Sequence, residues 1–75
     1  MLANDQQAVL SALIRAKLGS FILEEVAAIA ALPLERAWYA VLELIELRFM
    51  APAGIGFYCL TAEGKEMARR LVAAS

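Results

Sequence analysis

Apolar side chains recur three or four residues apart along most of this chain, and that spacing gathers them on one face of a helix. The pattern predicts helices at about residues 5–18, 23–31, 33–47 and 62–73. In the first, second and last of these helices, the residues expected to face a common core are Val9, Leu10, Leu13, Ile14, Leu23, Val26, Ala27, Ala30, Met67, Ala68 and Leu71. The order of the elements therefore favours a mainly helical fold.

The third helix carries more apolar surface than a single core needs. At about 100° per residue, its contiguous apolar arc consists of Leu34, Ala37, Val41, Leu44 and Ile45. Trp38 and Leu42 widen this arc on one side, and Ala40 and Leu47 widen it on the other. We therefore expect Trp38 and Leu42 to make a second contact, either with the terminal helices or with another protomer.

Local signals suggest where the first three helices begin and end. Asn4 followed by Gln7 resembles a capping box at the start of the first helix, and Gly19 is a natural stop after its last turn. Leu32 and Pro33 break the second helix, and Pro33 is suited to the first position of the third. A break this short between two helices has the spacing of a helix-turn-helix.

Between the third and last helices, the pattern changes to one typical of strands. We expect a hairpin over residues 48–61, with its loop at Ala51–Gly56. Because two strands alone are marginally stable, Phe21-Ile22 could add a third strand. Thr61 is a good N-cap for the last helix. Gly64 in the first turn of that helix costs about 1 kcal/mol relative to Ala, and a close approach of backbone to the hairpin would explain it.

Composition limits the chemistry that this chain can perform. Its 75 residues fit a single domain, 1–75, with 63% hydrophobic residues and a net charge of −1. The chain has no His and one cysteine, Cys59. No nucleophile–base pair, metal-ligand cluster or phosphate-binding loop is visible. We therefore expect no enzyme activity, no metal and no cofactor.

The chain shows no signal for export or for membrane insertion. Its first residues contain neither a basic region nor a long apolar core. The longest uncharged run, Phe49–Ala62, is interrupted by Pro52, Gly54 and Gly56 and is too short to span a bilayer. We expect a small acidic protein of the cytoplasm that makes no contact with membrane.

Three stretches resemble the winged helix-turn-helix superfamily, in particular small regulators of the MarR and PadR type. They are Glu25-Val26-Ala27 with Ala30-Ala31-Leu32-Pro33, then Val41-Leu42-Glu43-Leu44 leading to Phe49-Met50, and Tyr58-Cys59-Leu60-Thr61-Ala62-Glu63-Gly64. The last is the most specific. The chain departs from the pattern at Ile22, where such families often have Ser or Thr, at Arg48 in place of Gly, and at Cys59 in place of a basic residue.

The resemblance implies a homodimeric DNA-binding transcriptional regulator whose third helix enters the major groove. Glu35, Arg36 and Tyr39 would then face the bases or phosphates, and Arg36 could pair with guanine. Further cations that could contact the DNA backbone in a dimer are Arg15, Lys17, Lys65, Arg69 and Arg70. Most of these cations are equally well explained as ordinary surface charges near helix ends.

The charge pattern favours an alternative, which is an acidic winged-helix module that binds a protein and not DNA. The polar arc of the third helix carries three Glu (35, 43 and 46) and Arg36, a sum of −2. The expected wing loop, Ala51–Gly56, carries no charge. The candidate partner or dimer contacts are Trp38, Leu42 and Leu71. Both functions remain open at this point, because fold alone does not fix function.

Overall fold

The computed structural model describes residues 2–74. The elements follow in the order α1 (Asn4–Ala16), β1 (Phe21–Ile22), α2 (Leu23–Ala30), α3 (Leu34–Glu46), β2 (Met50–Pro52), β3 (Phe57–Leu60) and α4 (Ala62–Ala74). This is the winged helix-turn-helix arrangement expected from the sequence. Within the described residues, none of the helices is both long and apolar enough to cross a membrane.

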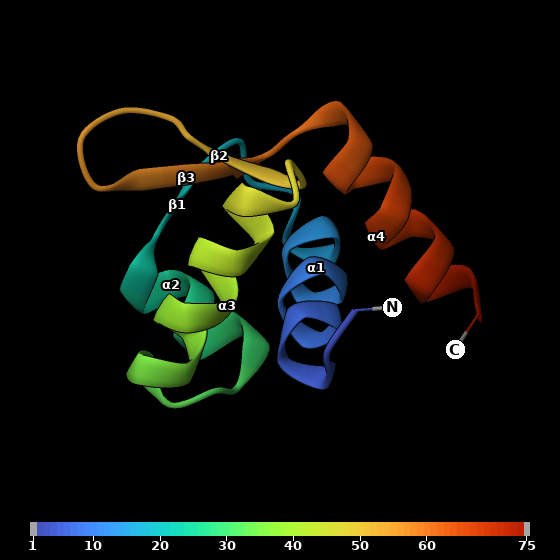
Figure 1. Ribbon diagram of the computed structural model, residues 1–75, viewed down its shortest axis with the longest axis horizontal. Coiled ribbons are helices and arrows are strands. Elements are labelled where there is room, and N and C mark those ends of the chain that lie inside the picture. Colours follow the sequence, from blue (N-terminus) through green and yellow to red (C-terminus); the bar gives the residue numbers. More distant parts are fainter. Residues whose placement is uncertain (1, 75) are drawn as a thin grey trace.

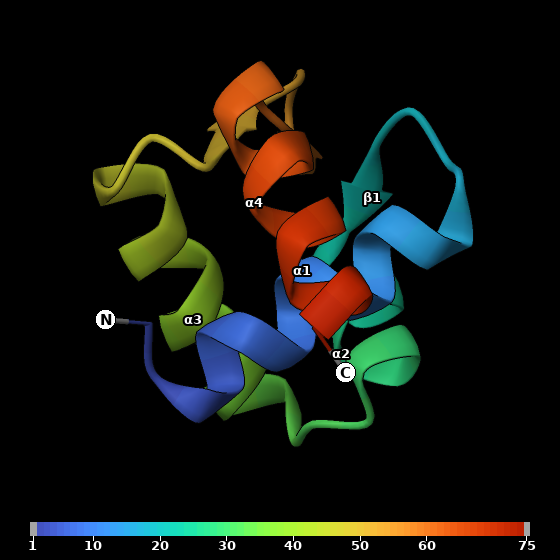
Figure 2. The ribbon, with the colours of Figure 1, turned by 90° about the vertical axis from the view of Figure 1, so that its right-hand side faces the viewer.

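The helices form the body of the molecule and the small sheet lies across one end of it (Figure 1). In this view α1 lies between α3 and α4, and Figure 2 shows α4 in front of α1 with α3 to one side. The antiparallel sheet has the strand order β1-β3-β2. Phe21 pairs with Tyr58 and Ile22 with Phe57, which confirms the third strand. This pairing ties the loop before α2 to the wing.

The first helix begins one residue earlier, and ends two residues earlier, than the sequence predicted. Its N-cap is Ala3, whose backbone N–H donates to Oε1 of Gln6 at 3.0 Å, so Gln6 fills the role expected of Gln7. The helix ends at Ala16 because Lys17 adopts the left-handed conformation, with φ 57°. Gly19 is therefore not the stop. The early end lets the chain turn so that Phe21 enters the core, where it is buried.

The turn between α2 and α3 is tight. Ala31 is left-handed, with φ 56°, and the backbone N–H of Leu32 donates to the carbonyl oxygen of Ala27 at 3.0 Å. Pro33 is the N-cap of α3 and not its first residue. At the start of α2, Ile22 has no polar side chain to cap the helix, but its backbone N–H donates to Oε1 of Glu25 at 3.0 Å. Glu25 thus supplies one half of a capping box, while the half that a Ser or Thr side chain would supply is missing.

Side chains from every helix and from the sheet meet in one core. Its buried apolar members are Val9, Leu10, Leu13, Phe21, Val26, Ala27, Ala37, Ala40, Val41, Leu44, Met50, Leu60 and Ala68. The sequence placed Leu34 in the apolar arc and Leu47 at its edge, yet each is 49% exposed. Leu34 lies in the first turn of α3, before the helix reaches the core, and Leu47 follows its last turn. Ala40, which was placed at the edge of the arc, is buried.

The wing and α4 are joined through one closely packed junction. The Thr61 hydroxyl donates to the carbonyl oxygen of Arg48 at 2.7 Å and accepts from the backbone N–H of Gly64 at 3.0 Å. A Cβ at position 64 would overlap the carbonyl oxygen of Phe49. This confirms the close backbone approach expected there. The wing loop is shorter than predicted, since β2 extends through Pro52.

Candidate interaction surface on the third helix

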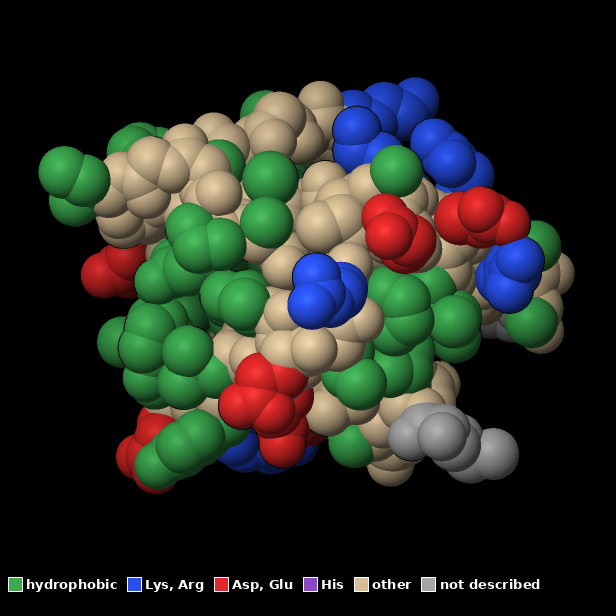
Figure 3. Space-filling model, turned by 45° about the horizontal axis from the view of Figure 1, so that its top comes forward, with side chains coloured by type: hydrophobic (Ala, Val, Ile, Leu, Met, Phe, Trp, Pro, Cys, Tyr) green, Lys and Arg blue, Asp and Glu red, His purple; other side chains and the backbone are tan. Residues whose placement is uncertain are grey.

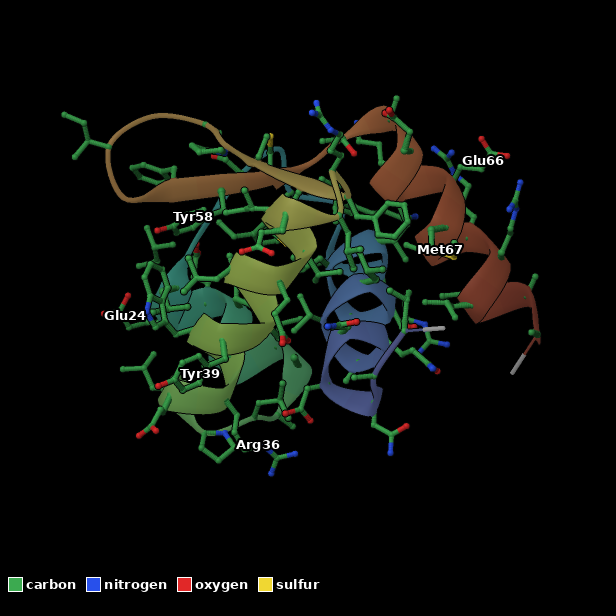
Figure 4. The ribbon with its side chains drawn as sticks, in the orientation of Figure 1. Glu24, Arg36, Tyr39, Tyr58, Glu66 and Met67 are labelled. Carbon is green, nitrogen blue, oxygen red and sulfur yellow. The ribbon has the colours of Figure 1, made fainter. Side chains whose placement is uncertain are left out.

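One side of α3 is open to solvent along the whole helix. Its buried positions are Ala37, Ala40, Val41 and Leu44, which turn the opposite side of the helix to solvent. The exposed α3 residues are Leu34, Glu35, Arg36, Trp38, Tyr39, Leu42, Glu43 and Glu46. Figure 4 shows Tyr39 and Arg36 at the outer end of this helix, on the opposite side of the molecule from Glu66 and Met67 of α4.

Arg36, the only cation on α3, is held by a carboxylate of α1. Its Nε donates to Oδ2 of Asp5 at 2.9 Å, and its second terminal nitrogen donates to Oδ1 at 2.6 Å. This two-point hydrogen bonding lowers the pKa of Asp5 and raises that of Arg36. Paired in this way, the guanidinium would have to leave Asp5 before it could contact a guanine base.

A second contact ties the same side of α3 to the start of α1. Nε2 of Gln6, which is buried, donates to Oε1 of Glu43 at 3.0 Å. Glu35 and Glu46 have no ion-pair partner among residues 2–74. Because Asp5 already neutralises Arg36, these free carboxylates dominate the charge of the exposed face.

A strip of large apolar side chains runs along this acidic face. Leu34, Trp38 and Leu42 are spaced four residues apart, so they lie one above the other on the helix; we call them the apolar strip. Trp38 is 36% exposed and Leu42 is 37% exposed. The ring of Trp38 meets that of Tyr58 edge to face, with centroids 6.1 Å apart. Trp38 therefore rests on the sheet while part of its surface remains open to solvent.

The apolar strip borders a shallow groove between α2 and α3. Leu23, Leu34, Glu35 and Trp38 line this groove, whose volume is about 430 Å³. Hydrophobic side chains gather on the side of the molecule where α2, α3 and the wing lie (Figure 3). Patches of this kind on a small domain usually mark a surface that contacts a partner.

The other cations that were expected at DNA lie elsewhere. Arg15 borders a hollow between α1 and α2. Lys17 and Lys65 lie together with Arg69 around a separate cavity of about 480 Å³, between the end of α1 and α4. The structure thus brings Lys17 and Lys65 together, but not with Arg36 or Tyr39 of α3.

This basic cluster was missed from the sequence. Lys65 and Arg69 are spaced i,i+4 on α4, which placed them on one face of that helix. Lys17 comes close to these two cations only because α1 packs against α4, and no local pattern in the sequence predicts that packing. Leu71, a predicted partner contact, is partly buried against the core. Among residues 2–74, no group of three or more potential ligands could hold a metal.

The comparisons with known proteins identify the fold. No protein-family model and no curated protein matches the chain. The crystal structure of the MarR family transcriptional regulator SPO1453 from Silicibacter pomeroyi DSS-3 matches with a TM-score of 0.84 and 19% identity, over 97% of this chain and 53% of that chain. The crystal structure of ligand-free NadR matches with a TM-score of 0.79 and 18% identity, over 97% of this chain and 54% of that chain.

The chain therefore spans about half the length of these two structures. The likeness confirms the winged helix-turn-helix fold of MarR type that the sequence resemblance predicted.

Proposed function

We propose that this chain is a protein-docking winged-helix module, which uses the exposed face of α3 to bind a basic, amphipathic segment of a partner protein. The observation that carries the proposal is the composition of that face. An apolar strip of Leu34, Trp38 and Leu42 is flanked by the free carboxylates of Glu35 and Glu46. A partner with lysines or arginines around an apolar stripe would complement both features.

Charge argues against phosphates as the ligand of this face. Affinity for DNA depends mainly on Lys and Arg side chains that neutralise phosphates and release counterions. On α3, the one candidate is Arg36, and it is engaged by Asp5. Phosphates approaching the helix would meet the carboxylates of Glu35 and Glu46, and the wing loop has no cation to compensate.

The expected affinity is modest. Complete burial of one large apolar side chain is worth about 1.5–3 kcal/mol, and the three members of the strip are already partly covered. Their remaining exposed surface therefore contributes roughly 2–4 kcal/mol. A dissociation constant of about 10–100 μM, which corresponds to about 5.5–7 kcal/mol, requires a similar contribution from the partner's own apolar side chains and from the charges on the rim.

Trp38 makes a direct test convenient because it is the only tryptophan in the chain. Its fluorescence would be followed during titration with a helical peptide of Leu and Lys, and with a matched peptide of Leu and Glu. We expect a saturable shift with the basic peptide alone. Leu42→Ala should weaken binding about tenfold, whereas Leu47→Ala, equally a Leu→Ala change at an exposed site, should not. Equal responses to both peptides would overturn the proposal.

A second candidate is a homodimeric DNA-binding transcriptional regulator of the cytoplasm. The specific observation in its favour is the match to SPO1453 over 97% of this chain. In this case Arg36 would exchange Asp5 for a guanine or a phosphate, and Glu35 and Tyr39 would lie at the DNA. Arg15, Lys17 and Lys65 of two protomers would have to supply the backbone contacts. Binding of a labelled duplex separates this candidate from the first.

A further inference from the structure

Two surfaces on different sides of the molecule carry unpaired charges of opposite sign. Figure 3 shows Lys and Arg side chains, with acidic side chains beside them, at the end of the molecule where α4 begins, away from the hydrophobic side formed by α2, α3 and the wing. The first surface is the acidic face of α3 with its apolar strip. The second is the α1/α4 cavity, defined by Lys17, Lys65 and Arg69.

The α1/α4 cavity has the chemistry that a partner of α3 needs. Its three cations surround an apolar lining made by Leu13, Ile14, Leu18 and Leu60. Within residues 2–74, none of these cations has an ion-pair partner. Leu18 is 52% exposed, so apolar surface at this cavity is open to solvent. The cavity is thus both basic and apolar, as the partner of the α3 face must be.

We infer that a second copy of this chain is a partner of the α3 face, and that its α1/α4 cavity receives the apolar strip. The inference rests on the proposed docking function and names the occupant. Leu34, Trp38 and Leu42 would cover the apolar lining, while Glu35 and Glu46 would meet Lys17, Lys65 and Arg69. One contact would thus bury both partly exposed apolar surfaces and pair both sets of unpaired charges.

The geometry of this contact differs from that of a closed dimer. The two surfaces are different patches of the same protomer, since α3 carries one and the end of α1 forms the other together with α4 (Figures 1 and 2). A contact between unlike patches leaves one free patch on each end, so assembly continues head to tail instead of closing about a twofold axis. The average mass should therefore rise with concentration. It should fall at high salt, because exposed charges are screened within about 3 Å at 1 M.

The test is sedimentation velocity of the wild type and of two charge-reversal variants. Glu35→Lys with Glu46→Lys removes the acidic patch, and Lys65→Glu with Arg69→Glu removes the basic one. At about 100 μM and 50 mM salt, we expect the wild type to form species larger than dimers, and each variant alone to be monomeric. An equimolar mixture of the variants should assemble again, since the intact acidic face of one meets the intact basic cavity of the other, and the two reversed patches are complementary to each other as well.

Several outcomes would overturn the inference. A wild type that remains monomeric throughout would do so, as would a dimer that neither variant disrupts, or a mixture of variants that stays monomeric. Circular dichroism of each variant verifies that it is folded. If Trp38 still responds to the basic peptide while the wild type remains monomeric, only the choice of a second copy fails. If neither binding occurs, the docking function fails as well.

Discussion

The exposed face of α3 and the α1/α4 cavity differ in which of their charged side chains are paired. On α3, the cation is paired with Asp5 and the carboxylates of Glu35 and Glu46 are left free. At the cavity, three cations lie together without a carboxylate among the residues that line it. The comparison shows that a chain with a net charge of only −1 can carry two surfaces of opposite sign. The acidic surface is the one on α3.

The largest effect should come from breaking the junction on which both surfaces depend. Gly64→Ala would drive a methyl group into the carbonyl of Phe49, which is backbone and cannot rotate away. We expect the free energy of unfolding to fall by about 3 kcal/mol or more, a large share of the stability of a chain this size. Urea denaturation followed by circular dichroism measures it. A variant as stable as wild type would show that α4 can shift away from the wing.

A smaller loss should follow from Trp38→Ala. Because Trp38 is partly exposed and rests on Tyr58, we expect a cost of about 2–3 kcal/mol, which is the sum of one aromatic pair and the burial of about two thirds of the side chain. A core aromatic would cost about 3–5 kcal/mol. The measurement is again denaturation by urea. A loss in the upper range would place Trp38 in the core and would remove the apolar strip as a docking surface.

Reversing one charge on each surface should change stability in opposite directions. Lys65 lies in the first turns of α4 and beside two other cations, so Lys65→Glu relieves repulsion and suits the helix dipole. Glu35 is in the first turn of α3, where its negative charge is favourable, so Glu35→Lys should destabilise. We expect about 0.5 kcal/mol each way at low salt and low protein concentration. Two changes of the same sign would contradict the division of charge described above.

The smallest effect concerns the pair that holds Arg36. The guanidinium lowers the pKa of Asp5 below its ordinary value of 3.8. The pair therefore stabilises the fold at neutral pH, and this contribution is lost as the pH falls through the lowered pKa. NMR titration should find the pKa of Asp5 below 3.8 and nearer to that value in Arg36→Gln. An Asp5 that titrates identically in both proteins would mean that Arg36 is free in solution.

Most of the fold could be predicted from the sequence because its signals are local. The helical periodicity, the break at Leu32-Pro33 and the cap at Thr61 all act within one or two turns of the chain. Even the close approach at Gly64 was expected, because glycine destabilises a helix relative to Ala and a close backbone contact would explain its presence there. The errors at the C-terminal ends of α1 and α2 arose because the backbone becomes left-handed without a glycine, at Lys17 and Ala31.

The candidate site was harder to predict because it depends on contacts between distant residues. Arg36 and Asp5 are 31 positions apart, and nothing in the sequence around either residue predicts that they pair. The grouping of Lys17 with Lys65 likewise requires the packing of α1 on α4. The acidic character of α3 was visible in its composition. The structure strengthens that expectation, because Arg36, the one cation on α3, is paired with Asp5.

The central claim is that the exposed face of α3 binds protein and not duplex DNA. The most direct test is fluorescence anisotropy of a labelled mixed-sequence duplex, titrated with the protein across a salt series. We expect no saturable binding at protein concentrations up to about 10 μM, even at low salt, since phosphate neutralisation dominates non-specific affinity. Micromolar binding that weakens steeply as salt rises would contradict the account and establish a DNA-binding protein.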